Sequence, residues 1–231
     1  MAQGDLLVTG TDTGVGKTVI AAALILELRA RGVRAIGFKP VETGVNAGDV
    51  ADSEVLAAAG GVDEPLVAPL LRLAEPLAPA VAAHRAGTAL EPAAVVGRLR
   101  ALRERGYTVV VEGAGGLLVP LAWTLTALDL AADERLTAVV VSRAGLGTLN
   151  HTLLTVEVLR RRGVAVGGVV LNGRGDPPDL AEETNPAALG RLLAGVPIVV
   201  VPRHATADPL AAARLSVPAL SPLLDAVPTR R

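Results

Sequence analysis

Residues 6–18 read LLVTGTDTGVGKT, and residues 19–26 continue as VIAAALIL. An apolar run of strand type leads into a glycine-rich loop, and the loop leads directly into an apolar helix. In this setting the N–H groups of the loop and of the helix N-terminus wrap a phosphate chain. The Lys17 ammonium reaches the outer phosphates, and the Thr18 hydroxyl ligates a magnesium ion. The segment therefore predicts a P-loop.

The loop departs from the usual P-loop pattern at one position. The first glycine of the pattern is replaced by Thr11, and Gly10 comes one residue early. An ordinary glycine-rich turn is the alternative, because glycine tolerates a positive φ angle. The Gly-Lys-Thr sequence that opens an apolar helix favours the P-loop. The loop residues that we expect to contact a nucleotide are Asp12, Thr13, Gly14, Val15, Gly16, Lys17, Thr18 and Val19.

The two lysines of the chain, Lys17 and Lys39, contrast with its twenty arginines. The two cation types are not interchangeable where a compact ammonium is needed. A helix from Thr18 to about Arg31 spans roughly 20 Å, and the strand that follows returns about 15–20 Å. Lys39 should therefore emerge at the P-loop edge of the sheet, where open α/β sheets bind ligands. A solvated surface lysine is the alternative.

Composition excludes several classes of function. The chain has 231 residues, a formal net charge of −1, one Trp, one Tyr, one Phe and no cysteine. Such a charge and so few aromatic residues offer nucleic acid neither a basic surface nor a stacking platform. No apolar run reaches the ~18 residues of a membrane helix, and no export leader precedes the first strand. The absence of cysteine rules out disulfides and a thiolate nucleophile. We expect a cytoplasmic protein without nucleic-acid or membrane partners.

Apolar runs alternate with helical patterns along the chain. The continuous Val and Leu character of these runs is typical of strands buried on both faces, as in a parallel sheet. Each of three helix-to-strand joints places an arginine before a glycine, at Gly32, Gly106 and Gly163. The fold class is therefore α/β, a single P-loop NTPase-like domain over residues 1–231 whose mostly parallel central sheet carries helices on both faces. The Pro- and Ala-rich segment Glu64–Pro92 is expected as an excursion beside the sheet. The expected strands are Leu6–Thr9, Ala35–Phe38, Thr108–Val111, Ala138–Val141, Val166–Leu171 and Val196–Val201.

Carboxylates near the expected ligand edge are candidates for holding a metal. Glu112 ends the run Val109-Val110-Val111, and small residues follow it. At that place a carboxylate can hold Mg²⁺ or its water near the phosphates. A strand-end glutamate before a glycine turn is the alternative. The acidic residues Asp49 and Asp52 supply another ligand, unless they only form an acidic helix N-terminus.

Four segments resemble the dethiobiotin synthetase family, the ATP-dependent enzymes that close the ureido ring in biotin synthesis. They are GTDTGVGKT from Gly10, FKPVETG from Phe38, VEGAGGLLVPL from Val111 and GLGTLNHTLLT from Gly145. The resemblance covers most of the chain. It implies a ligase, a homodimer that converts 7,8-diaminopelargonic acid, carbon dioxide and ATP into dethiobiotin, ADP and phosphate, with Mg²⁺.

The resemblance also implies roles for individual residues. Lys17 and Thr18 serve the phosphates and the magnesium ion, and Glu112 and Asp52 complete the metal site, with Asp49 as the other choice. The family's fuller Pro-His pattern is missing at Pro79-Ala80, which leaves the role of His84 open. The remaining correspondences place Lys39, Thr43, Thr13, Gly115 and Gly116 at the substrate and γ-phosphate, Leu146, Gly147, Thr148, Leu149 and Asn150 at the neighbouring subunit's diamine, and Asn172, Pro202, Arg203 and His204 around adenine.

The chemistry that the resemblance implies needs no protein nucleophile. One substrate amine takes up CO₂ as a carbamate, and a carbamate oxygen attacks the γ-phosphate to give a mixed anhydride. The second amine then closes the ring and expels phosphate. The protein positions the reactants and neutralises charge on the phosphoryl oxygens. Lys39 and Lys17 are thus the candidate catalytic residues, and Lys39 is expected to stabilise the carbamate and the transferring phosphoryl group.

Two other classes share parts of these patterns. Partitioning or division-site ATPases have a related fold, but they carry a signature lysine five residues before the P-loop lysine, where this chain has Asp12. They also need a basic surface or an amphipathic tail, and Ser221–Arg231 has two prolines and no helical stripe. A cobyrinic-acid-type amide synthetase would need a glutaminase cysteine. The switch ATPase is therefore the alternative function.

Overall fold

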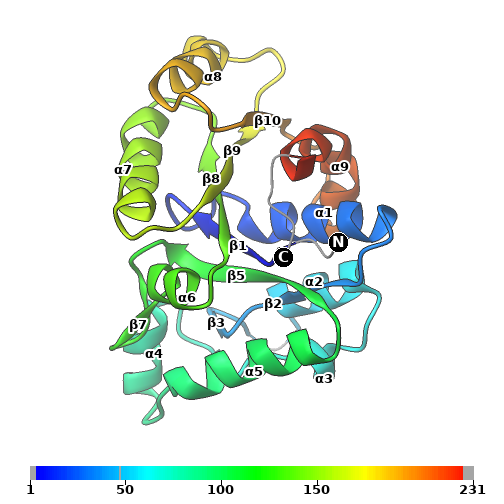
Figure 1. Cartoon of the computed structure of the whole chain (residues 1–231), viewed down its shortest axis with the longest axis vertical. Coiled ribbons are helices and arrows are strands. Elements are labelled where there is room, and N and C mark those ends of the chain that lie inside the picture. The colour runs from blue at the N-terminus through cyan, green and yellow to red at the C-terminus, as the bar shows by residue number, and fades with distance from the viewer. Residues whose placement is uncertain (1–3, 47, 226–231) are drawn as a thin grey trace.

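The computed structural model describes residues 4–46 and 48–225 as a parallel sheet with helices on both faces (Figure 1). The strands of the central sheet are β1 (Leu6–Gly10), β2 (Ala35–Phe38), β5 (Thr108–Gly116), β8 (Thr137–Arg143), β9 (Val166–Arg174) and β10 (Ile198–Pro202). The shorter strands are β3 (Val41–Thr43), β4 (Leu71–Leu73), β6 (Pro120–Ala122) and β7 (Leu125–Thr126). The helices are α1 (Lys17–Ala30), α2 (Asp52–Gly60), α3 (Glu64–Val67), α4 (Pro79–Arg85), α5 (Pro92–Glu104), α6 (Ala127–Asp133), α7 (Thr148–Arg161), α8 (Leu180–Leu192) and α9 (Pro209–Asp225).

The central sheet has the strand order β10-β9-β8-β1-β5-β2, and every pairing in it is parallel. All six predicted strands are present, so the predicted fold class is confirmed. Strands β5 and β9 run past their predicted ends, to Gly116 and Arg174. Because β1 lies between β5 and β8, the loop that follows β1 is flanked by the carboxyl ends of both neighbours.

Alternating side chains of each strand feed two separate hydrophobic clusters. In β1, Leu6 and Val8 pack with α1 and α9, whereas Leu7 packs with residues of α5 and α6 on the opposite face. This follows from the two-residue period of a strand. Both faces are covered, which explains why the strands are continuously apolar. Figure 1 shows α1 and α9 on one side of the sheet and α6 and α7 on the other.

The three helix ends that were predicted at glycines are present. Gly32, Gly106 and Gly163 have φ angles of 80°, 80° and 76°. At each joint the residue after the glycine donates its N–H to a carbonyl in the last turn of the helix, as Val33 does to Leu28 at 3.0 Å. This is the left-handed helix ending that favours glycine. It turns the chain sharply from each helix into the next strand.

The segment predicted as an excursion contains α3, β4 and α4. Strand β4 pairs in parallel with β3 in a separate two-stranded sheet, in which Arg72 lies opposite Glu42. Strand β3 begins just after β2, so this small sheet lies beside the ligand edge of the large one. The pairing matters for the site because Glu42 and Arg72 both reach α2.

The C-terminal segment corrects one expectation. Helix α9 runs to Asp225 although Pro218 and Pro222 lie inside it. Both prolines are exposed, while Leu220, Leu223 and Leu224 form a buried stripe. Prolines spaced four residues apart share one helix face, so the opposite face is free to pack against α1. Residues 226–231 lie outside the described part of the chain.

A buried ion cluster holds the amino ends of the strands, at the edge opposite the P-loop. Arg103 of α5 donates from Nε to Asp5 Oδ2 at 2.6 Å and also pairs with Glu134. Asp5 in turn accepts the N–H of Val109 at 2.8 Å. The cluster joins α5, β5 and the residues just after α6. Within the described ranges no helix is long and apolar enough to cross a membrane.

Candidate active site

The P-loop connects β1 to α1 through close backbone contacts. Gly14 and Gly16 have φ angles of 74° and 93°, which L side chains rarely adopt. A Cβ atom at Gly10 would meet the Asp12 carbonyl oxygen at 2.7 Å, so this early glycine is required by packing. Thr11, at the usual glycine position, instead points its hydroxyl to Ser142 at 3.0 Å. The departure in the motif therefore has a structural explanation.

A cavity of about 340 Å³ opens between the P-loop, the ends of β2 and β5, and α2. Both lysines of the chain line it, although they lie 22 residues apart in sequence. Of the predicted residues, the described cavity wall contains Thr13, Gly14, Gly16, Lys17, Thr18, Val19, Lys39, Thr43, Asp52, Glu112 and Gly115.

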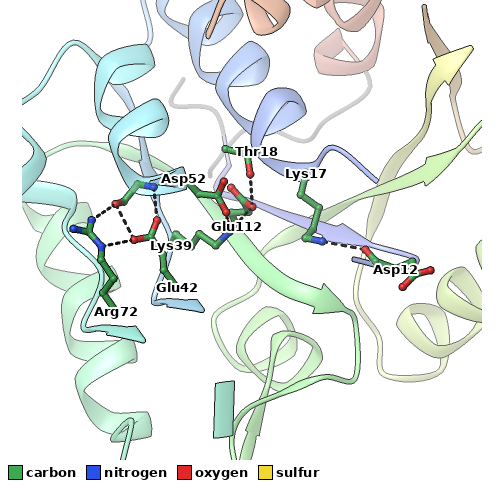
Figure 2. Close-up of polar contacts among 9 residues, drawn as sticks. Asp12, Lys17, Thr18, Lys39, Glu42, Asp52, Arg72 and Glu112 are labelled. Atoms are coloured by element: carbon green, nitrogen blue, oxygen red, sulfur yellow. Dashed lines mark hydrogen bonds and ion pairs between the residues drawn. The ribbon is translucent and has the colours of Figure 1, made fainter. Parts of the chain in front are cut away.

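Lys39 is buried and lies between two carboxylates (Figure 2). Its Nζ atom is 2.9 Å from Glu112 Oε1 and also contacts Asp52. Burial by itself lowers the pKa of Lys39, but the charges of Glu112 and Asp52 outweigh burial and raise the pKa well above its usual value. Lys39 is therefore a fixed cation in this site, and it does not serve as a proton acceptor.

Glu112 combines complete burial with an unsatisfied oxygen. Its Oε1 accepts hydrogen bonds from Lys39 and from the Thr18 hydroxyl, the latter at 2.9 Å. Its Oε2 is buried without a hydrogen-bond partner among the described residues. Burial raises the pKa of Glu112, and the nearby Lys39 ammonium opposes that rise. An orphaned carboxylate oxygen is costly unless a ligand or ion satisfies it.

The oxygen atoms around Glu112 fit a magnesium ion. The Thr18 hydroxyl and the carboxylates of Glu112 and Asp52 are hard oxygen donors of the kind that Mg²⁺ prefers. Across residues 4–46 and 48–225, no group of three or more His, Cys, Asp or Glu side chains is arranged to hold a metal. Protein sites for Mg²⁺ commonly use one or two carboxylates and leave the other positions to water and phosphate.

Lys17 lies across the loop that it follows. Its Nζ atom donates to the carbonyl oxygen of Asp12 at 3.1 Å. Burial lowers the pKa of Lys17, while the charge of Glu112 acts in the opposite direction. The Asp12 side chain points away from Lys17 and pairs with Arg143 of β8 at 2.8 Å. Asp12 thus offers its backbone carbonyl to Lys17 and its carboxylate to Arg143, and it does not itself line the cavity.

The sequence left open whether Asp49 or Asp52 belongs to the expected metal site, and the structure places the two residues differently. Asp52 begins α2 and contacts Lys39 at the cavity. Asp49 accepts the backbone N–H of Asn46 at 3.0 Å and closes a surface turn. Asp52 is therefore the aspartate beside Glu112 and Thr18.

Of the residues predicted around adenine, Asn172 contacts the P-loop, and neither it nor the segment 202–204 lines the cavity. Asn172, near the end of β9, donates from Nδ2 to the Val15 carbonyl at 2.9 Å. A Cβ atom at Gly16 would overlap that amide, with only 2.1 Å between them. His204 bonds to Ser216 of α9 at 2.9 Å, and Arg203 donates its N–H to Arg174 at 2.8 Å. These contacts place the segment 202–204 at the end of the sheet next to α9.

The segment 146–150 also lies outside this cavity. Leu146 is 88% exposed and Asn150 is exposed. Gly147 has a φ angle of 92° and precedes α7, whose first residue Thr148 is buried against Ser142 with 2.5 Å between their hydroxyl oxygens. The buried threonine anchors the segment while Leu146 faces outward. Gly116, Val15 and Leu149 are partly or fully buried and do not line the cavity.

Several residues at the site were missed by the sequence reasoning. Val41, Ala114 and Pro209 line the cavity. Val41 and Ala114 lie inside motifs that were noticed, so their position was available, but nothing marked Pro209 because α9 was not predicted. Glu42, Ser53 and Arg72 form a bonded cluster just behind Lys39 and Asp52 (Figure 2). Of these, Glu42 lies in the FKPVETG motif and Ser53 directly follows Asp52 in the acidic segment, whereas nothing marked Arg72.

Comparisons with known proteins show what the whole chain is similar to. A family model described as an AAA domain matches residues 4–207. A protein of Anaeromyxobacter dehalogenans (strain 2CP-C), named ATP-dependent dethiobiotin synthetase BioD, is 50% identical over 198 residues, which cover 85% of this chain and 89% of that protein. The protein of the same name from Mycobacterium tuberculosis (strain ATCC 25177 / H37Ra) is 46% identical over 189 residues, 81% of this chain and 82% of that one.

A solved structure shares the fold at low sequence identity. The septum site-determining protein MinD complexed with Mg-ADP from Pyrococcus horikoshii OT3 superposes with a TM-score of 0.56 and 18% identity, over 97% of this chain and 95% of that one. Identity this low shows the α/β fold alone and does not favour a switch ATPase.

Proposed function

The chain belongs to the ATP-dependent dethiobiotin synthetase family, and we propose that the cavity beside the P-loop is where it makes dethiobiotin from 7,8-diaminopelargonic acid, CO₂ and ATP. The enzyme is an ATP-dependent ligase of biotin biosynthesis. The observation that carries the site assignment is that the chain's two lysines meet Asp52 and Glu112 at one cavity. We place the enzyme in the cytoplasm.

The ATP phosphates lie along the P-loop in this proposal. The N–H groups of the loop and of the first turn of α1 point at the phosphate oxygens, and the helix dipole favours their negative charge. Lys17 exchanges its bond to the Asp12 carbonyl for a phosphate oxygen. That exchange gives the partly desolvated ammonium an ionic partner.

Thr18, Asp52 and Glu112 would hold Mg²⁺. The buried Glu112 Oε2 without a partner supports this assignment. When bound, the ion neutralises charge on the β- and γ-phosphates and orients them. The protein's part is to keep the two carboxylates and the hydroxyl facing one point, which Lys39 assists by bonding to both carboxylates.

Lys39 stabilises the anions that form during the reaction. The carbamate arises when one substrate amine bonds to CO₂ and releases a proton. A carbamate oxygen then bonds to the γ-phosphorus as the bond to ADP breaks. A permanently protonated lysine stabilises both the carbamate and the transferring phosphoryl group. In the last step the second amine bonds to the carbamate carbon, and phosphate leaves as the ring closes.

The remaining predicted residues would position the two substrates. We place Thr13, Thr43 and Gly115, which line the cavity, and the adjoining Gly116 near the γ-phosphate; a Cβ atom at Gly115 would lie 3.5 Å from the Thr13 hydroxyl oxygen. For adenine we propose Asn172 and the segment 202–204. Since Asn172 donates its amide hydrogen to the loop, its carbonyl oxygen is the group that would accept from the adenine amine.

We further propose that the enzyme is a homodimer in which residues 146–150 cap the diamine carboxylate of the neighbouring subunit. The support is that Leu146 and Asn150 are exposed and do not line the cavity of their own chain. The N-terminal end of α7 follows directly, and a helix N-terminus attracts a carboxylate.

The test is phosphate release by the purified protein with Mg-ATP and bicarbonate, with and without 7,8-diaminopelargonic acid, together with mass detection of the organic product. We expect release that depends on the diamine and a product of dethiobiotin mass. Phosphate release that ignores the diamine and yields no product would contradict the proposed reaction and favour a switch ATPase.

A further inference from the structure

Glu42 is a buried carboxylate beside the active site that no step of the proposed reaction uses. It lies on β3 and is 1% exposed. Its Oε1 accepts the backbone N–H of Ser53 at 2.6 Å, and its Oε2 accepts the Ser53 hydroxyl at 3.2 Å. A carboxylate buried this deeply must be compensated. These bonds tie it to the first turn of α2.

Glu42 takes the place of a missing helix cap. The N-cap residue of α2 is Ala51, whose side chain makes no capping hydrogen bond. The N–H of Ser53, the second residue of the helix, has no acceptor within the helix and is normally served by an N-cap side chain. Glu42 supplies that acceptor from strand β3, outside the helix. Its negative charge is also favourable at a helix N-terminus.

Arg72 keeps the charge of Glu42 balanced. The pairing of β3 with β4 sets Arg72 opposite Glu42. Arg72 donates from Nε to Glu42 Oε2 at 2.9 Å and from a second nitrogen to the Ser53 hydroxyl, also at 2.9 Å. Arg72 therefore gives the buried Glu42 carboxylate a cationic partner of its own, while Lys39 pairs with Asp52 and Glu112.

The cluster fixes the backbone next to Asp52. Asp52 directly precedes Ser53, and its side chain is 42% exposed. Burial alone does not hold such a side chain at the cavity, so its direction depends on the first turn of α2. Glu42 and Arg72 hold that turn by its second residue. Loss of this hold lets the helix end fray and Asp52 leave Lys39.

We propose that Glu42 is a positioning residue that acts through Asp52 to preorganise the magnesium site. The proposal rests on the proposed function, because it assigns Asp52 to that site. It predicts that Glu42 contributes to the gain in ATP affinity that Mg²⁺ confers, while it contributes little to binding of ATP without the metal.

The test measures ATP affinity by titration calorimetry with Mg²⁺ and with EDTA, for the wild type, Glu42→Ala, Asp52→Asn and the double variant. We expect Glu42→Ala to reduce the Mg²⁺-dependent gain by about fivefold or more, since residues in one network couple. The double variant should lose no more of that gain than Asp52→Asn alone. Equal losses with and without Mg²⁺, or effects that add in the double variant, overturn the proposal.

Two further variants keep the test decisive. Glu42→Gln retains an oxygen for the Ser53 N–H and lacks the charge for Arg72, so it should fold and show a smaller loss of the Mg²⁺-dependent gain. If Glu42→Ala does not fold, this variant decides, and an unchanged gain in it overturns the proposal. The matched control is Glu75→Gln, which breaks a comparable pair with Arg85 on the exposed surface and should leave the gain unchanged.

Failure of this proposal can be told apart from failure of the proposed function. A wild type that makes dethiobiotin, with Glu42 variants that keep the full Mg²⁺-dependent gain, overturns the positioning role alone. A wild type that makes no dethiobiotin, with Glu42 variants that lose the gain through Asp52, overturns the reaction and supports the positioning role.

Discussion

Single residues divide the work of the site, and the two lysines show this division most clearly. Both are partly or fully desolvated, but their partners differ. Lys17 bonds to a backbone carbonyl of the loop, whereas Lys39 is held by two carboxylates. In the proposed function, Lys17 exchanges its partner for a phosphate when ATP binds. Lys39 is expected to remain in place and to act on the reacting groups.

This division predicts that alanine substitutions of the two lysines change different quantities, turnover in one case and ATP affinity in the other. Lys39→Ala should lower kcat by about 10²–10³-fold, because it removes a fixed cation from the transition state, and should change ATP affinity little. Lys17→Ala should weaken ATP binding by about tenfold or more. Steady-state kinetics and ATP titration on both variants check the prediction.

Lys39→Arg is the matched control for charge. It keeps a cation but not the compact ammonium that fits between Asp52 and Glu112, so it should not restore turnover. Equal losses of turnover and ATP affinity in Lys39→Ala would sink the catalytic role of Lys39.

At the scale of elements, the site depends on how closely α2 packs on β2. Gly37 of β2 lies under α2, and a Cβ atom there would approach Leu56 Cβ to 2.6 Å. Atoms of real side chains do not come so close, so any larger residue displaces the helix. Asp52 is the first residue of α2. The close packing of α2 on Gly37 therefore fixes where Asp52 lies relative to the cavity.

Gly37→Ala should therefore destabilise the protein by about 1–3 kcal/mol through overpacking. Urea unfolding followed by circular dichroism measures the change. The matched control is Gly97→Ala in α5, where a Cβ atom would meet no atom within 4 Å. That variant should stabilise the protein by about 0.5–1 kcal/mol, because alanine has the higher helix propensity. A stable Gly37→Ala protein would contradict the packing argument.

At the scale of the whole molecule, a stabilising ion cluster and the candidate active site lie at opposite edges of the sheet. The cluster of Asp5, Arg103 and Glu134 holds the amino edge, while the cavity lies at the carboxyl edge. Burial by itself would raise the pKa of Glu134, but hydrogen bonds from Arg100 and Arg103 outweigh burial and lower it. A lowered pKa in the folded state means that the ionised carboxylate stabilises the fold.

This contribution should disappear in acid. It is fully present above the unfolded-state pKa of about 4.3, and it is lost as the pH falls through the lower folded pKa. Glu134→Gln should therefore cost about 1.5–3 kcal/mol of unfolding free energy at pH 7 and progressively less as the pH falls below about 4. Denaturant unfolding across pH measures this difference.

Glu157→Gln breaks an exposed pair with Arg161 and serves as the control. It should change stability by no more than about 0.5 kcal/mol at any pH. A Glu134→Gln difference that stayed constant into acid would refute the role assigned to the charge.

Much of the fold followed from sequence because its signals are local. Apolar runs marked the six strands, and glycines after arginines marked the helix ends. The two lysines marked the ligand edge, since strand and helix lengths fix where Lys39 emerges. The strand order and the β3–β4 pairing depend on contacts between distant segments, which no local pattern encodes. Arg72 was not predicted at the site because its place there depends on the β3–β4 pairing. The buried stripe of α9 was not predicted because two exposed prolines interrupt its sequence.

The charged side chains that line the cavity are Lys17, Lys39, Asp52 and Glu112, two of each sign. Opposite charges in equal number leave the side chains of the cavity without a formal net charge, and the whole chain is nearly neutral as well. Long-range steering of anions, which a basic cleft provides, is therefore weak here. Without Mg²⁺, ATP would bring its full negative charge next to two carboxylates. In the magnesium complex, the ion already neutralises part of that charge. If the proposed magnesium site is correct, we therefore expect ATP to enter this cavity as its magnesium complex.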